Sequence, residues 1–253
     1  MKKISLDKIV THCQSLLRVS EFEDWTQAMN GLQVANSGTV TRIAAAADIT
    51  PNTLRMAREV KADLMLVHHG FFWGGLLPWT GGRYEMIRDM IQSDIALYSV
   101  HLPLDAHPKI GNNALLAHML GLKKIKPFMK LKGQTIGFRG TRKIHREKLK
   151  SLLEEKLGSP CMLLPFGPET SQSIGVVSGG AGEETPDAHF EGVDTYVTGE
   201  GPHWTWGTAQ ELKINVIYGG HYKTESFGIQ ALAKNLSEKF SLPWHFLDDP
   251  SGL

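Results

Sequence analysis

The chain contains an internal repeat, in which two similar stretches each end in a histidine followed four residues later by a carboxylate. These residues are His101 and Asp105 in the first copy and His221 and Glu225 in the second, an offset of 120 residues. A unit that occurs twice in a sequence is expected to fold twice in the same way. The repeat therefore limits the possible folds more than any other feature of this chain.

Earlier segments of the two copies also match, at a larger offset. The segments 43–48 and 174–179 are both short runs of small and apolar residues, and they lie 131 residues apart. The same offset relates 62–73 to 193–204, including Trp73 and Trp204. The change of offset from 131 to 120 indicates that the second copy has lost a short loop.

Short apolar runs alternate with helical periodicities in both copies. The predicted strands are 43–47, 64–67 and 95–100 in the first copy and 174–177, 195–198 and 216–218 in the second. This alternation is typical of an α/β fold with parallel strands. No low-complexity linker separates the copies. We therefore predict two pseudo-repeated, intimately packed α/β halves, residues 1–125 and 126–253.

The composition argues against several classes of protein. Only two cysteines occur, Cys13 and Cys161, too far apart for a thiolate zinc motif and too few for a disulfide framework. A formal net charge of +1 argues against a nucleic-acid partner. No run approaches the ~20 consecutive apolar residues that cross a bilayer, and the N-terminal segment has the pattern of an amphipathic helix. We expect a cytoplasmic protein without a membrane partner.

Histidines and carboxylates follow several of the predicted strands. His68 and His69 follow one apolar run and precede Gly70, which would let the backbone bend so that both rings face one crevice. Ligands bind at the carboxyl ends of strands in open α/β sheets. Imidazole and carboxylate suit divalent Zn, Fe, Mn, Co and Ni. Because the candidate ligands exceed what one four-coordinate ion needs, we predict two ions.

The relation between His221 and Glu225 depends on where the following helix begins. If the helix begins near His221, their spacing puts both side chains on one face. If it begins later, a loop must bring them together. A carboxylate shared by the two ions would come from Asp105 or from Glu225, and the longer side chain of Glu225 spans two ions more easily.

The repeat also points to two residues outside this ligand set. His101 is the counterpart of His221, and Glu200 is the counterpart of His69. We predict that His101 and Glu200 lie near the ions as catalytic residues that transfer protons, or as hydrogen-bonding partners of the ligands. The alternatives are a capping carboxylate for Glu200 and a backbone-bonded histidine for His101.

Six motifs span nearly the whole chain. They are Asn30-Gly31-Leu32-Gln33, Val67-His68-His69-Gly70, His101-Leu102-Pro103-Leu104-Asp105, Gly111-Asn112-Asn113, Thr198-Gly199-Glu200 and Gly220-His221-Tyr222 with Thr224-Glu225. Their order resembles the short form of the Nif-three-like family of dinuclear metal proteins, also called GTP cyclohydrolase I type 2 homologues. The segment 201–204 departs from the commoner family sequences, which leaves the pocket rim and the substrate preference open.

The resemblance implies a ligand set and an assembly. One ion would be held by His69 and Asp105, the other by His68 and His221, and Glu225 would be shared. It also implies that the two halves surround a common cleft that contains the dinuclear site. A homohexamer is a further implication of the resemblance.

These features predict a metal-dependent hydrolase. A metal-bound hydroxide would attack a C–N, amide or phosphoester bond of a small-molecule substrate, and a GTP cyclohydrolase reaction is one version of this chemistry. The P-loop pattern GxxxxGK[ST] is absent from the sequence, which argues against nucleotide binding of that kind. The alternative is a non-catalytic metal-binding protein that acts as a regulator or adaptor.

Overall fold

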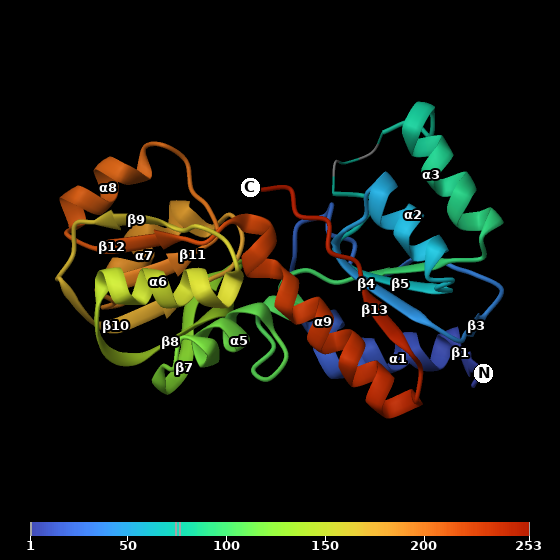
Figure 1. The fold of residues 1–253 in the computed structure, drawn as a ribbon, viewed down its shortest axis with the longest axis horizontal. Coiled ribbons are helices and arrows are strands. Elements are labelled where there is room, and N and C mark those ends of the chain that lie inside the picture. Colours follow the sequence, from blue (N-terminus) through green and yellow to red (C-terminus); the bar gives the residue numbers. More distant parts are fainter. Residues whose placement is uncertain (1, 74, 76, 253) are drawn as a thin grey trace. The chain divides into compact units, whose positions relative to one another are not determined.

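The computed structural model describes residues 2–73, 75 and 77–252, which form mixed α/β structure in two compact units (Figure 1). Unit 1 comprises Met1–Leu104 and Gly228–Asp249, and unit 2 comprises Asp105–Phe227 and Pro250–Leu253. The α/β fold class predicted from the alternating strands and helices is confirmed.

Unit 1 is built on a five-stranded sheet. The strand order is β13 (Trp244–Phe246), β4 (Ile43–Asp48), β5 (Leu64–His69), β6 (Ala96–Ser99) and β2 (Gly31–Val34). The first four strands are parallel, and β2 pairs with β6 antiparallel. Nearly every residue of β4, β5 and β6 is buried, which is the pattern of strands covered on both faces.

Helices cover both faces of the unit 1 sheet (Figure 1). They are α1 (Leu6–Leu17), α2 (Pro51–Glu59), α3 (Gly81–Gln92) and, from Gly228 on, α9 (His221–Phe240). α2 and α3 pack on one face through a shared hydrophobic cluster. α1 and α9 lie side by side on the other face, where His12 Nε2 and Asn235 Oδ1 are 3.0 Å apart.

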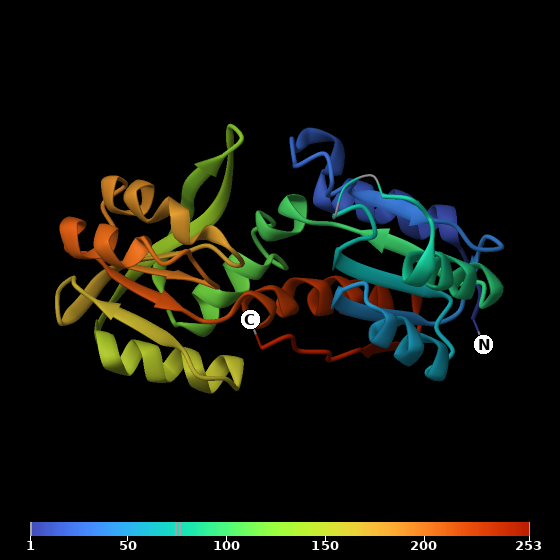
Figure 2. The ribbon, with the colours of Figure 1, turned by 90° about the horizontal axis from the view of Figure 1, so that it is seen from above.

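Unit 2 is built on a six-stranded sheet. The strand order is β7 (Lys123–Leu131), β8 (Gln134–His145), β10 (Thr170–Val176), β11 (Thr195–Thr198), β12 (Asn215–Tyr218) and β9 (Met162–Pro165). β10, β11 and β12 are parallel, whereas β7, β8 and β9 join the sheet through antiparallel pairings. The end of the β7–β8 hairpin extends away from the rest of its sheet (Figure 2).

The helices of unit 2 also lie on both faces of their sheet (Figure 1). They are α5 (Asn112–Met119), α6 (Arg146–Leu157), α7 (Thr185–Phe190) and α8 (Thr205–Leu212). α5 and α6 share one hydrophobic cluster with the strands. The remaining short elements are β1 (Ile4–Ser5), β3 (Thr39–Val40), α4 (Leu102–Asp105) and the 3-10 helices η1 (Val19–Glu21) and η2 (Ala181–Glu184).

The internal repeat is visible in the order of the strands. β4-β5-β6 and β10-β11-β12 are parallel triplets in the same order, and an antiparallel strand pairs with the third member of each. These added strands, β2 and β9, begin at Gly31 and Met162, which are 131 residues apart. The repeat therefore includes an edge strand in addition to the segments recognised in the sequence.

Each copy of the repeat contributes its last segment to the sheet of the other. The β7–β8 hairpin follows the first copy and pairs with β10, whereas β13 follows the second copy and pairs with β4. The chain passes between the units at Leu104 to Asp105, at Phe227 to Gly228 and at Asp249 to Pro250. This reciprocal exchange makes unit 1 discontinuous in sequence. The boundary of the repeated halves at residues 125 and 126 stays a prediction.

Both cysteines are free and buried. Burial raises the pKa of Cys13 to about 12, and burial with the nearby charge of Glu154 raises the pKa of Cys161 to about 12. Neither thiol is therefore a reactive thiolate at neutral pH. Within the described ranges, no helix is both long enough and apolar enough to cross a membrane.

Phe128 of β7 fills space that two glycines leave open in unit 2. Its side chain is 1% exposed, and its ring meets that of Tyr196 edge-on with centroids 6.3 Å apart. A Cβ added to Gly175 would lie 2.6 Å from Phe128 Cε1, and one added to Gly137 would lie 3.1 Å from Phe128 Cδ1. The phenyl ring therefore occupies the volume that side chains at both glycines would need.

We predict that Gly175→Ala lowers the free energy of unfolding by about 1–3 kcal/mol, because the ring must move aside. Phe128→Ala should cost about 3–5 kcal/mol, because it leaves a cavity. The double variant should lose less than the sum, since the alanine methyl fills part of that cavity. Urea denaturation of the wild type and the three variants measures these energies. Strictly additive losses would show that the ring and the glycine do not share this space.

Candidate metal centre

Three histidines gather at the carboxyl edge of the unit 1 sheet. His68 and His69 end β5, and their ring centroids are 4.8 Å apart. His101 follows β6, the neighbouring parallel strand, and its centroid lies 4.9 Å from that of His68 and 5.5 Å from that of His69. Parallel strands end at the same edge, so the pairing of β5 with β6 brings these rings together.

Gly70 follows the histidine pair and allows a close approach between two segments. A Cβ at this position would overlap the side-chain amide of Gln33, whose Oε1 accepts a hydrogen bond of 2.9 Å from the N–H of Phe71. The backbone of Gly70 is outside the left-handed region. A residue with a side chain at position 70 would therefore clash with Gln33, which explains the glycine at this position.

Each imidazole of the site meets an acceptor at Nδ1. The contacts are His68 to Val100 O at 2.8 Å, His69 to Asp48 Oδ1 at 2.9 Å, His101 to Asp24 Oδ1 at 3.0 Å and His221 to Glu200 Oε1 at 2.7 Å. Carbonyl and carboxylate oxygens only accept, so each ring has its proton on Nδ1. The neutral rings of His68, His69 and His101 then have their lone pairs on Nε2.

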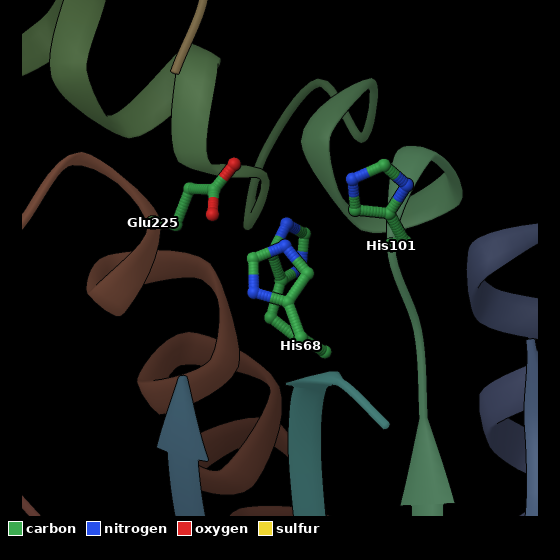
Figure 3. A group of neighbouring side chains, drawn as sticks. His68, His101 and Glu225 are labelled. Atoms are coloured by element: carbon green, nitrogen blue, oxygen red, sulfur yellow. The ribbon is translucent and has the colours of Figure 1, made fainter. Parts of the chain in front are cut away.

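This pattern of hydrogen bonds is the one that metal-binding histidines use. One ring nitrogen from each of His68, His69 and His101 lies within 4.8 Å of the others in unit 1, and His68 and His101 are labelled in Figure 3. We call these three residues the histidine group. Three imidazoles with their Nδ1 atoms occupied suit a divalent ion such as Zn, Fe, Mn, Co or Ni.

His221 and Glu225 lie in the first turn of α9. The helix begins at His221, so the i, i+4 spacing does place both side chains on one helix face. His221 Nε2 is 2.9 Å from Glu225 Oε2, and Nδ1 of the same ring is bonded to Glu200. The imidazole is therefore bracketed by two carboxylates.

Two glycines after β10 lie against this pair. Gly179 has φ +69, and a Cβ there would overlap Oε1 of Glu225. A Cβ on Gly180 would lie 3.6 Å from His221 Cε1, which is an ordinary contact. The N–H of Gly179 donates to Thr224 Oγ1 at 3.0 Å. The close approach of the chain at Gly179 therefore helps to define the position of the Glu225 carboxylate.

Asp105 is buried in unit 2, where it accepts hydrogen bonds. Its Oδ1 accepts from Asn112 Nδ2 at 2.7 Å and from Ser178 Oγ at 3.2 Å. The assignment of Asp105, His221 and Glu225 as metal ligands stays a prediction.

The second copy of the repeat has one extra residue before its histidine. The N–H of Val100 donates to Val67 O, and the N–H of Gly219 donates to Thr198 O. Val67 and Thr198 are 131 residues apart, whereas Val100 and Gly219 are 119 apart. The offset of 120 at the histidines therefore includes Gly220, whose φ of +88 suits glycine.

Charge and burial set the pKa values of two site residues. Burial alone would lower the pKa of His221, but its hydrogen bonds and ion pairs with Glu225 and Glu200 raise the pKa to about 9. Burial alone would raise the pKa of Asp24, but the contact with His101 and the hydrogen bonds from Asn30 and the Trp25 N–H hold it below its usual value. His221 is therefore protonated at neutral pH in the metal-free protein.

Two carboxylates at the site were not predicted from the sequence. Asp48 is paired in register with His69 across β4 and β5 and binds its Nδ1. Its place at the end of a predicted strand is a signal that could have identified it. Asp24, which binds Nδ1 of His101, lies outside helices and strands, and no periodicity or motif points to it.

Comparison with known proteins gives a consistent match over the chain. The model of the family described as Duf34/NIF3 (NGG1p interacting factor 3) matches residues 4–251. A protein of Deinococcus radiodurans named GTP cyclohydrolase 1 type 2 homolog is 40% identical, with 99% of this chain and 95% of the relative covered. A protein of the same name from Archaeoglobus fulgidus is 36% identical, with 99% and 100% covered.

Solved structures have the same fold. The crystal structure of TTHA1606 from Thermus thermophilus matches with a TM-score of 0.92 and 35% identity, covering 99% of this chain and 100% of that one. Reduced HcgD from Methanocaldococcus jannaschii matches with a TM-score of 0.85, covering 98% and 99%. At 22% identity, the second likeness concerns the fold alone.

We predict that His221 titrates with a midpoint of about 9 in the metal-free protein. Because this pKa exceeds the ordinary value of 6.5, the stabilisation from charged His221 is complete below pH 6.5 and is lost as the pH rises through about 9. NMR titration of the ring measures the midpoint. Glu200→Gln should lower it, whereas Glu211→Gln, at an exposed position of α8, should not. A wild-type midpoint near 6.5 would refute this assignment of charges.

We also predict that Gly179→Ala weakens Zn or Co binding by about 10–100-fold, because the added methyl displaces the Glu225 carboxylate. Gly180→Ala is the matched control, since its methyl makes only an ordinary contact with His221. Isothermal titration calorimetry of the two variants and the wild type gives the affinities. Equal affinities in the two variants would mean that the position of Glu225 does not govern metal binding.

Proposed function

The chain belongs to the Duf34/NIF3 family, as its motifs predict, and from this premise we propose that it binds two divalent metal ions and hydrolyses a small-molecule substrate. The observation that supports this proposal is that four histidines each have an oxygen acceptor within hydrogen-bond distance of Nδ1. One such histidine is compatible with an ordinary hydrogen bond in a protein core. Packing alone does not require four, placed after strands of both copies of the repeat.

The proposed ligands are divided between two ions. His69 and Asp105 would hold one ion, His68 and His221 would hold the other, and Glu225 would be shared. Glu225 contacts His221 directly, and its side chain is longer than that of Asp105, which supports a bridging role. The donor set suits Zn, Fe, Mn, Co or Ni.

The chemistry that we propose combines the ions with acid–base residues. Bound divalent ions lower the pKa of water and polarise a carbonyl or phosphoryl oxygen. Glu200 has a side chain that is 50% exposed and bonded to His221, so it can exchange protons with a substrate and with the ring. His101 has a proton acceptor at Nε2. These two residues are our candidates for proton transfer during cleavage of a C–N, amide or phosphoester bond.

A second candidate function is that of a non-catalytic metal-binding regulator or adaptor. The burial of the ligands favours it, because His68 is 0% exposed and Glu225 is 3% exposed, and closed sites are typical of structural ions. The exposure of His221 and Glu200, with side chains 32% and 50% exposed, favours the hydrolase. We prefer the hydrolase because substrate can reach these two residues.

Assembly and location are further parts of the proposal. A homohexamer follows from the family resemblance, and a cytoplasmic location follows from the composition. Both are independent of the reaction that the site performs.

A metal-dependent activity assay tests the proposal. Protein stripped by a chelator and reloaded with Zn, Mn, Fe or Co is assayed with nucleotides, cyclic imides and dipeptides. GTP is included because relatives are named GTP cyclohydrolase 1 type 2 homologs. We expect turnover with at least one combination, and a loss of about 100-fold or more in Glu200→Gln with the metal content unchanged. Glu211→Gln is the matched control and should keep full activity.

Two results would count against this function. Protein that contains two ions but turns over none of the substrates would favour the adaptor. Protein that binds no divalent ion after reloading would contradict both candidate functions.

A further inference from the structure

We propose that Asp24 is a positioning residue that fixes the tautomer of His101 and keeps Nε2 of this ring as its lone-pair nitrogen within the histidine group. The inference rests on the proposed metal-binding function, because it concerns the same site. The tautomer itself can be measured without metal, so the two proposals can fail separately.

The carboxylate of Asp24 is surrounded by hydrogen-bond donors. The contacts are the Trp25 N–H to Oδ1 at 2.7 Å, His101 Nδ1 to Oδ1 at 3.0 Å, Asn30 Nδ2 to Oδ2 at 2.8 Å and the Leu102 N–H to Oδ2 at 3.0 Å. The side chain of Asp24 is only 6% exposed. Each oxygen accepts two hydrogen bonds away from water, which makes the arrangement specific for an ionised carboxylate.

His101 is held at its backbone as well as at its ring. The N–H of His101 donates to Asn30 Oδ1 at 2.7 Å, and Asn30 in turn donates to Asp24. Asp24, Asn30 and His101 therefore form a closed ring of hydrogen bonds. A rotation of the imidazole away from Asp24 would break this ring, so the segment before β2 determines the orientation of a histidine that follows β6.

Two tryptophans restrict the same imidazole. The ring centroid of His101 lies 5.7 Å from that of Trp25 and 4.6 Å from that of Trp73. Trp25 is adjacent to Asp24 in the chain, and its own N–H is bonded to the carboxylate. Packing against these indoles and the hydrogen bond at Nδ1 therefore favour the same ring position.

The second copy of the repeat holds its histidine differently. His221 is bonded to Glu200, which is half exposed and is the counterpart of His69 in the first copy. Asp24 is buried, so water screens its interaction with His101 much less. His101 therefore has a more rigid orienting carboxylate than its repeat partner.

The tautomer of His101 in the wild-type protein is the primary test. Metal-free protein with 15N-labelled histidine is studied by long-range 1H–15N correlation NMR, which distinguishes protonation at Nδ1 from protonation at Nε2. We expect the neutral ring of His101 to have its proton on Nδ1. A neutral His101 protonated on Nε2 would overturn the inference without any variant being made.

The variant Asp24→Asn tests the cause. An asparagine offers one oxygen to the four donors, so its NH₂ group must face two of them, and His101 can relieve part of this conflict by losing the proton at Nδ1. We expect a shift of His101 toward the Nε2-protonated form, which has no proton acceptor at Nε2. An unchanged tautomer would overturn the inference.

Asp63→Asn is the matched control. Asp63 accepts hydrogen bonds from the Thr41 N–H at 2.8 Å, from the Thr41 hydroxyl at 2.6 Å and from the Arg42 N–H at 3.0 Å. It precedes β5, at the amino edge of the same sheet. This variant should lose stability without altering the tautomer of His101. An equal shift of the tautomer in both variants would reduce the role of Asp24 to a purely structural one.

The outcomes separate this inference from the proposed function. Wild-type protein that binds no Zn but shows the Nδ1 proton on His101, and loses it in Asp24→Asn, would refute the metal site and retain the positioning role. Wild-type protein that binds Zn while Asp24→Asn changes nothing would refute the positioning role alone. If Asp24→Asn does not fold, the wild-type tautomer decides.

Discussion

The parallel pairing of β4, β5 and β6 is the constraint on which the site in unit 1 depends. It places the ends of three strands at one edge, and it also supplies the groups that orient the ligands. His68 is bonded to the carbonyl of Val100, which follows β6, and His69 is bonded to Asp48, which ends β4. Because side chains alternate between the faces of a strand, a slip of one residue between these strands would reverse the contacts. The register that builds the core therefore also sets the chemistry of the imidazoles.

The second copy uses the same framework with different residues. His69 is replaced by Glu200, and the loop after β10 has Gly179 in the place of Asp48. The glycine creates room for the Glu225 carboxylate, which contacts His221. Duplication has therefore produced two related but unequal clusters, one dominated by imidazoles and the other by carboxylates.

Much of the fold could be predicted from periodicity, but parts of the site could not. The runs 64–67 and 195–198 are apolar enough throughout to predict buried strands, and β5 and β11 confirm them. α9 begins at His221, although its apolar pattern is clear only from about Gly228, because its first turn contains mainly polar residues. β7 is not predicted, because its many lysines interrupt the apolar pattern and only two of its residues, Phe128 and Met129, are buried. Asp24 has no local signal at all, since its role arises only from tertiary contacts.

The exchange of β13 and the β7–β8 hairpin has a consequence for the gene. A message truncated after the first copy would encode the β7–β8 hairpin without β10, the strand with which it pairs. It would also encode β4 without its parallel neighbour β13. The second copy alone would have the converse defect. A single-copy ancestor could complete its sheet only by exchanging these terminal segments with a second copy of itself in a homodimer. Tandem fusion of two copies would then have placed both exchanged segments in one polypeptide.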